Sequence, residues 1–160
     1  ASELMLTLLA PCERYFRRVT LLGFVADIVP ISLERGHVVP HAPLDLDAPS
    51  DTGRALASFG AGAQRLRGAV LLVLGDGRNN RRPARAEELA KLRRRSGLVA
   101  WLVPEPLERW GAGDSAMPAY ERVSDVTLAV PDLGSLAAAL ARLPGRIARG
   151  RRAIRGTHAR

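Results

Sequence analysis

One carboxylate, Asp76, occupies a position where the sequence favours chemistry. Residues 70–80 form the stretch VLLVLGDGRNN, an apolar run that ends in glycine and then in Asp76. A continuous run of Val and Leu bounded by glycine is typical of a strand buried on both faces, as in a parallel sheet. Ligands of open α/β sheets bind beyond the carboxyl ends of such strands, so Asp76 is the first candidate for function. The alternative is that Asp76 only closes a turn, because Asp-Gly is common turn chemistry.

A second segment with suitable chemistry is Ser50-Asp51-Thr52-Gly53, which follows a predicted loop and opens a predicted helix. One interpretation is that Ser50 or Asp51 caps this helix. The other interpretation is that the hydroxyl groups reach the carboxyl edge of the sheet near Asp76. A carboxylate with hydroxyls and water is a hard oxygen set that suits Mg²⁺.

The elements that must position these residues alternate between strands and helices. Apolar spacing predicts helices at 3–16, 51–66, 81–95 and 132–143, strands at 19–24, 28–31, 70–74, 98–103 and 126–130, and loops at 34–49 and 105–122. We expect Pro83 to open the third helix, Asp132 to cap the last helix, and Pro144-Gly145 to end it. This order predicts an α/β fold with a doubly wound, parallel sheet and right-handed crossovers.

Composition limits the class of protein. The 160 residues are 47% hydrophobic and 25% charged, which is typical of one globular domain. Six arginines and no acidic residue lie in 146–160, so they supply six of the eight net positive charges, and we expect a disordered basic tail over 144–160. The single Cys12 excludes an internal disulfide and a cysteine-based metal site. No apolar run is long enough for a membrane span or a signal peptide, so we expect a cytoplasmic protein.

Several sequence blocks together carry a resemblance to a known family. They are APSDTGRAL, LLVLGDGRNNRRPARAEELAKLRRR, LVAWLVPEP, WGAGDSAMPAY and VPDLGSLAAAL. In sequence and spacing they resemble the von Willebrand factor A (VWA) domains of the CoxE-like family, over residues 1–143. The resemblance implies a Rossmann-like, doubly wound, mostly parallel sheet with helices on both faces, and a non-enzymatic interaction module.

The resemblance also implies a metal-ion-dependent adhesion site with three parts. Asp76 matches the third part, and Gly53 with Ala55 fixes a register that puts Ser50, rather than Thr52, at the family's Thr position. The first part, an Asp-x-Ser-x-Ser loop after the first strand, does not occur in the sequence. We therefore expect that strand and loop to be missing by truncation, Mg²⁺ or Mn²⁺ binding to be incomplete, and a central strand to be left with an unpaired edge.

Partner contacts follow from the same resemblance. It implies that the partner is a MoxR-type AAA+ ATPase and that the pair acts in maturation of a client such as carbon monoxide dehydrogenase. It also implies that the domain holds a metal ion, and that this ion binds an acidic residue of the partner. Five residues match the family blocks and are candidates for partner contacts: Asn79, Asn80, Trp110, Asp114 and Tyr120. The alternatives are turn formation for the two asparagines and packing of the long loop for Trp110 and Tyr120.

Two other function classes stay open. The stretch GDGRNN resembles the Gly-Asp-Gly-x-x-Asp Mg²⁺ motif of haloacid dehalogenase-type phosphohydrolases, but Asn80 replaces the last Asp. No Asp-x-Asp nucleophile pair ends an earlier predicted strand, and without a nucleophile the reaction does not run. The basic stretch 78–95 and the arginine tail suit electrostatic nucleic-acid binding, but they lack interleaved aromatic residues, so a solvated face is the preferred interpretation.

Overall fold

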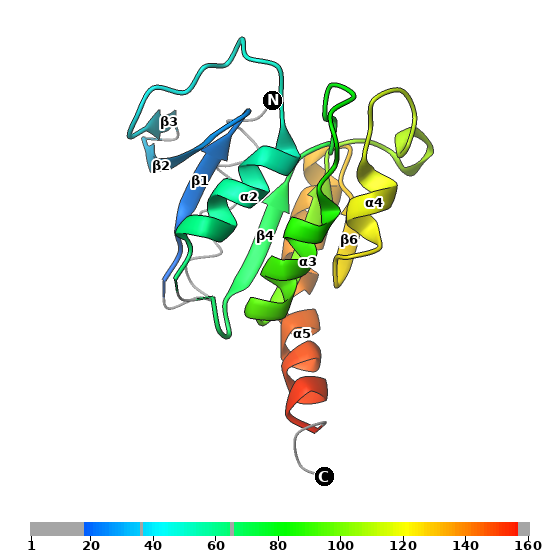
Figure 1. Cartoon of the computed structure of the whole chain (residues 1–160). Coiled ribbons are helices and arrows are strands. Elements are labelled where there is room, and N and C mark those ends of the chain that lie inside the picture. The colour runs from blue at the N-terminus through cyan, green and yellow to red at the C-terminus, as the bar shows by residue number, and fades with distance from the viewer. Residues whose placement is uncertain (1–17, 36, 65, 157–160) are drawn as a thin grey trace.

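Within the residues that the structure describes, the strands form two separate three-stranded sheets. The computed structural model describes residues 18–35, 37–64 and 66–156, so the predicted helix at 3–16 and Cys12 lie outside the described residues. The first sheet is antiparallel, in the order β1 (Leu21–Phe24), β2 (Ile28–Glu34) and β3 (His37–Pro40). The second is parallel, in the order β4 (Val70–Leu74), β5 (Leu98–Val103) and β6 (Val126–Ala129) (Figure 1).

Helices cover both faces of the parallel sheet, which confirms the predicted α/β class. The helices are α2 (Thr52–Gly62), α3 (Ala86–Arg95), α4 (Met117–Glu121) and α5 (Leu133–Gly156), with a short 3₁₀ turn, η2 (Leu107–Arg109). Figure 1 shows α2 and α3 in front of β4 and α5 behind the sheet.

Successive side chains of β5 point to opposite faces of the parallel sheet, so this strand contributes to the hydrophobic core on each face. Val99, Trp101 and Val103 belong to a cluster with Leu56 of α2 and with α3. The intervening residues of β5 face the other way, where they pack against α5. All six residues of β5 are buried, as expected for a strand with a paired neighbour on each edge and a helix layer on each face.

The two sheets end in edges that no described strand covers. Among the residues that the structure describes, β4 pairs only with β5, and β1 pairs only with β2. The carboxyl ends of β1 and β4 are nevertheless close, because the Phe24 ring lies 3.7 Å from the point where a Cβ on Gly75 would stand. The carbonyl of Val25 also accepts a hydrogen bond from the amide of Asp51, at 2.9 Å.

Several of the predicted segments differ from the structure in their bounds. The predicted loop at 34–49 contains β3, because Val38 and Val39 complete a ladder with β2. The predicted loop at 105–122 contains η2 and α4. The helix predicted at 81–95 begins only at Ala86, since three residues before it have positive φ and cannot be helical.

The last helix is capped as predicted but does not end as predicted. The Asp132 carboxylate accepts the backbone N–H of Ser135 at 2.8 Å, which lowers the pKa of Asp132. The helix then passes through Pro144 and continues to Gly156, beyond the ends of the strands (Figure 1). A proline removes one helical hydrogen bond but does not end a helix that its neighbours support. No helix in the described part of the chain has both the length and the apolar character needed to cross a membrane.

Candidate interaction site

Asp76 lies in a tight turn directly after β4. Its carboxylate Oδ1 accepts the backbone N–H of Arg78 at 3.0 Å, which is the turn-closing role expected as the alternative. The indole Nε1 of Trp101 donates to the carbonyl of Gly75 at 2.8 Å and so fixes the start of the turn. Gly77 has φ of +66°, and a Cβ there would stand 2.5 Å from Sδ of Met117, so the turn requires glycine. The carboxylate is therefore held in one place by the chain around it.

The segment that precedes α2 lies against this turn, as the sequence predicts for its hydroxyl groups. The hydroxyls of Ser50 and Thr52 each donate to the backbone carbonyl of Arg78, both at 3.4 Å. Asp51 is the N-cap of α2, and its Oδ1 accepts the N–H of Arg54 at 2.9 Å. The segment therefore has both of the expected features: Asp51 caps α2, and the hydroxyls of Ser50 and Thr52 face the neighbouring turn.

Asn79 joins three segments from a buried position. Its side chain is 1% exposed. Its Oδ1 accepts the N–H of Thr52 at 2.8 Å, and its Nδ2 donates to the carbonyls of Arg82 and Pro83, each at 2.9 Å. A side chain that is enclosed and hydrogen-bonded in this way has no surface for a partner, which corrects the prediction of Asn79 as a partner contact. Its role is to hold the turn against α2.

Asn80 and Arg81 form the exposed tip of a second turn. Both have positive φ, of 49° and 59°, and the carbonyl of Asn79 accepts the N–H of Arg82 at 2.9 Å. Two successive positive φ values in a hydrogen-bonded turn are the type I′ pattern, in which glycine is usual at the position of Arg81. The Asn80 amide donates to the Ser50 hydroxyl at 2.8 Å and to its carbonyl at 3.1 Å. The loop before α2 therefore supports the strained turn.

Arg78 ties the loop after β4 to the loop after β5. Its guanidinium forms a two-pronged ion pair with Glu105, at 2.9 and 3.1 Å, and an ion pair with Asp114 at 2.8 Å. Asp114 also accepts the N–H of Asn80 at 3.2 Å. The hydrogen bond from Arg78 lowers the pKa of Asp114, and the bonds to Asp114 and Glu105 raise the pKa of Arg78. Asp114 is thus an ion-paired carboxylate that is fixed at the surface and shares Arg78 with Glu105.

The two aromatic candidates pack the long loop. Tyr120 is fully buried, stacks on Trp101 with ring centroids 4.6 Å apart, and donates its hydroxyl to the carbonyl of Ala84 at 2.7 Å. Burial raises the pKa of this hydroxyl. Trp110 is half-buried, and its Nε1 donates to the carbonyl of Glu105 at 3.3 Å. The prediction of Tyr120 as a partner contact is corrected, whereas Trp110 keeps an exposed part.

The described residues do not make up a complete divalent-cation site. Asp76 supplies one carboxylate, and Ser50 and Thr52 supply hydroxyls that already bond the carbonyl of Arg78. In the described ranges no group of three or more His, Cys, Asp or Glu side chains is placed to hold a metal ion. Mg²⁺ prefers an octahedral oxygen shell, which this donor set fills only in small part.

These contacts make one surface, which we name the loop platform: residues 50–52, 75–82 and 105–116. Sequence reasoning found its three segments but assigned no role to Arg78 or Glu105, the pair that joins two of them. An arginine two positions after Asp76, with acidic residues in the next loop, was the available signal. Opposite charges in consecutive loops of a parallel sheet are brought to the same edge.

Comparison with known families gives one match. A family model described as "VWA domain containing CoxE-like protein" matches residues 1–138. No curated protein and no solved structure matches the chain.

Proposed function

The chain belongs to the VWA-domain family of CoxE-like proteins, and from that premise we propose that it is a non-enzymatic module that binds a protein partner through its loop platform. The partner that the family resemblance favours is a MoxR-type AAA+ ATPase. The process it favours is maturation or assembly of a metalloenzyme such as carbon monoxide dehydrogenase. We propose a cytoplasmic location, where such an ATPase and its client would be assembled.

The observation that carries the proposal is that side-chain hydrogen bonds and ion pairs join the segments of the loop platform. Asn79, Asn80 and Arg78 each link two segments that are far apart in the sequence, and the side-chain bonds are 2.8 to 3.2 Å long. Loops fixed in this way lose little conformational freedom when they bind, so more of the contact energy appears as affinity. On this surface Leu107, 60% exposed, and the exposed part of Trp110 add apolar contact area beside polar groups.

Phosphohydrolase chemistry finds no support in the described residues. The Asp-x-Asp pair Asp45 and Asp47 lies in the exposed loop after β3, not at the end of a parallel strand. Asp45 Oδ1 accepts the backbone N–H groups of Asp47 and Ala48, at 3.0 and 3.1 Å. This local turn gives no nucleophile beside Asp76.

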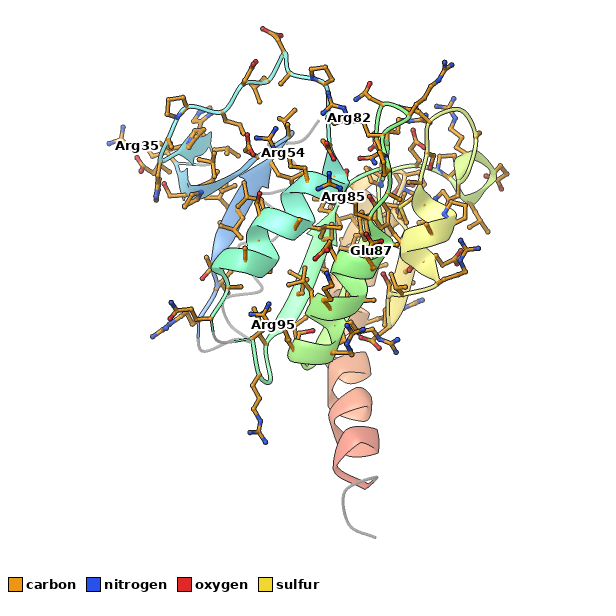
Figure 2. All side chains as sticks on the ribbon, in the orientation of Figure 1. Arg35, Arg54, Arg82, Arg85, Glu87 and Arg95 are labelled. Carbon is orange, nitrogen blue, oxygen red and sulfur yellow. The ribbon has the colours of Figure 1, made fainter. Side chains whose placement is uncertain are left out.

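Nucleic-acid binding is also disfavoured, because three of the four cations of α3 have partners among the described residues. Arg93 pairs with Asp125, Lys91 with Glu88, and Arg95 donates to carbonyls at the end of α2. Figure 2 shows Arg82 and Arg85 near the start of α3 and Arg95 near its other end, with the acidic Glu87 between them. Charges that are paired and spread along the helix release few counterions from a phosphate backbone.

The test is capture of the purified MoxR-type ATPase of the same organism by this protein. Leu107→Ser alters the loop platform, and Arg67→Ser, at the other end of β4, is the matched exposed control. We expect Leu107→Ser to reduce capture and Arg67→Ser to leave it unchanged. No capture by the wild type, or equal capture by both variants, would overturn the proposal.

Metal binding is tested separately, by calorimetric titration with Mg²⁺ and Mn²⁺. Asp76 and Ser50 are the ligands that the family resemblance assigns. Because one carboxylate is a small part of a cation shell, we expect this chain to bind either ion with a dissociation constant of about 1 mM or weaker. Micromolar affinity that is lost in Asp76→Ala, but kept in the exposed control Asp47→Ala, would contradict this expectation.

A further inference from the structure

Three arginines follow one another closely on the loop platform, and only one of them is free. Arg78 is paired with Glu105 and Asp114, and Arg82 is paired with Asp51 at 3.2 Å. Arg81 lies between them, is exposed, and has no hydrogen-bond or ion-pair partner among the described residues. Of these three arginines, Arg81 is therefore the one whose guanidinium is available.

The backbone of the turn that carries Arg81 is strained. Arg81 has φ of 59°, in the left-handed region, where a residue other than glycine is strained by about 1 kcal/mol. The strain persists because the preceding Asn80 is bonded to Ser50 and to Asp114, and because Arg82 closes the turn onto Asn79. Glycine, the usual residue here, would relieve the strain but supply no charge. Strain held in this way concentrates at functional positions.

Arg81 also lines a hollow in the surface. The hollow has a volume of about 310 Å³ and is lined by Asn80, Arg81, Gly113 and Asp114. Gly113 has φ of +66° and leaves the wall without a side chain. The carboxylate of Asp114 is already bonded to Arg78 and to the N–H of Asn80, so Arg81 is the charged side chain lining this hollow that has no bonded partner among the described residues.

We propose that Arg81 binds a carboxylate side chain of the protein partner in this hollow, an inference that rests on the proposed function. A guanidinium presents a planar fork that pairs with the two oxygens of a carboxylate. One free arginine flanked by neutralised ones fits one acidic side chain, whereas a phosphate chain needs a row of free cations. The recognition group is thus the chain's own arginine rather than a metal ion at Asp76.

The test uses Arg81→Asn, because asparagine tolerates positive φ and so keeps the turn. The chain offers a matched control in Arg85→Asn: Arg85 is exposed, has φ of 49° and has no side-chain partner among the described residues, but it does not line the hollow. Binding of the purified MoxR-type ATPase is measured for the wild type and both variants. In parallel, the peptide acetyl-Gly-Glu-Gly-amide is titrated and followed by the amide signals of Arg81 and Gly113 in NMR spectra.

We expect Arg81→Asn to weaken ATPase binding about tenfold, as loss of one charge-assisted hydrogen-bonded pair does, and to abolish the peptide-induced shifts. Arg85→Asn is expected to behave as the wild type in both measurements. Equal behaviour of the two variants, or a response to a short single-stranded oligonucleotide stronger than to the peptide, would overturn the inference. If the wild type does not bind the ATPase, the proposed function fails, and the peptide titration still decides whether Arg81 is a carboxylate site.

Discussion

Strands β5 and β1 show how differently the two sheets are built. Every residue of β5 is buried, whereas none of the four residues of β1 is. Strand β5 has a paired strand on each edge and helices on both faces, but β1 is paired on one edge among the described residues. Burial in this fold therefore follows from neighbours rather than from apolar content, because Leu21, Leu22 and Phe24 are as apolar as the residues of β5.

The loops repeat this contrast. The loops after β4 and β5 are joined by side chains that reach from one to the other, such as Arg78 to Glu105. The loop after β3 is exposed around Leu46, which is 78% accessible, and Asp45 bonds its own neighbours there. A binding surface needs preorganised groups, and the parallel sheet supplies them at its carboxyl edge.

The largest expected change in the free energy of unfolding comes from making the same substitution, Leu to Ala, in each of the two sheets. Leu102→Ala in β5 removes a fully buried side chain that packs with Val130 and Leu136, so we expect it to lower the free energy of unfolding by about 3 kcal/mol. Leu22→Ala in β1 removes a half-buried side chain and should cost about 1 kcal/mol. Urea unfolding measures both, and equal losses would show that the antiparallel sheet is packed as firmly as the parallel one.

A smaller effect is expected where the loop platform meets α2. Asn79→Ala removes three hydrogen bonds and leaves the buried backbone N–H of Thr52 unsatisfied, so we expect a loss of about 2 kcal/mol. Asn80→Ala, one residue away and exposed, should cost below about 1 kcal/mol. Thermal unfolding compares the pair, and a reversed order would mean that Asn79 does not join the segments in solution.

The central strands were predictable because their apolar runs are continuous and end in glycine or proline. The predictions for β4 and β5 match the structure residue for residue. Strand β3 was missed because His37 and Pro40 look like loop residues, although a proline is tolerated on an edge strand. The start of α3 was missed because no local pattern shows that Arg85 has positive φ.

The sequence was enough to predict which segments form the site, but not which side chains of those segments contact one another. Asp76 and Ser50 lie on adjacent loops as the alternation of strands and helices implies. Asn79 is turned away from solvent by its hydrogen bond to Thr52, which lies 27 positions earlier in the chain. Tyr120 is turned away from solvent by its stacking on Trp101. Such pairings are set by packing between elements, which local spacing does not encode.

The smallest expected change in the free energy of unfolding comes from breaking an ion pair in the loop platform or one beside the antiparallel sheet. The hydrogen bond from Arg78 holds the pKa of Asp114 below its ordinary value of 3.8. The stability that Asp114 contributes is therefore fully present above pH 3.8 and is lost as the pH falls through the lower pKa of the folded state. We expect Asp114→Asn to be less stable than the wild type at pH 7, with a difference that shrinks as the solution is acidified below that value.

The matched control is Asp27→Asn, which breaks the pair of Asp27 with Arg54 beside the antiparallel sheet. In that pair the side chains are 58% and 54% exposed, against 27% for Asp114 and 31% for Arg78, so water screens it more and its loss should matter less. Urea unfolding at a series of pH values measures both variants. If the difference for Asp114→Asn stayed constant through the acid range, Arg78 would be held by Glu105 alone, and the platform would owe its rigidity to one ion pair rather than two.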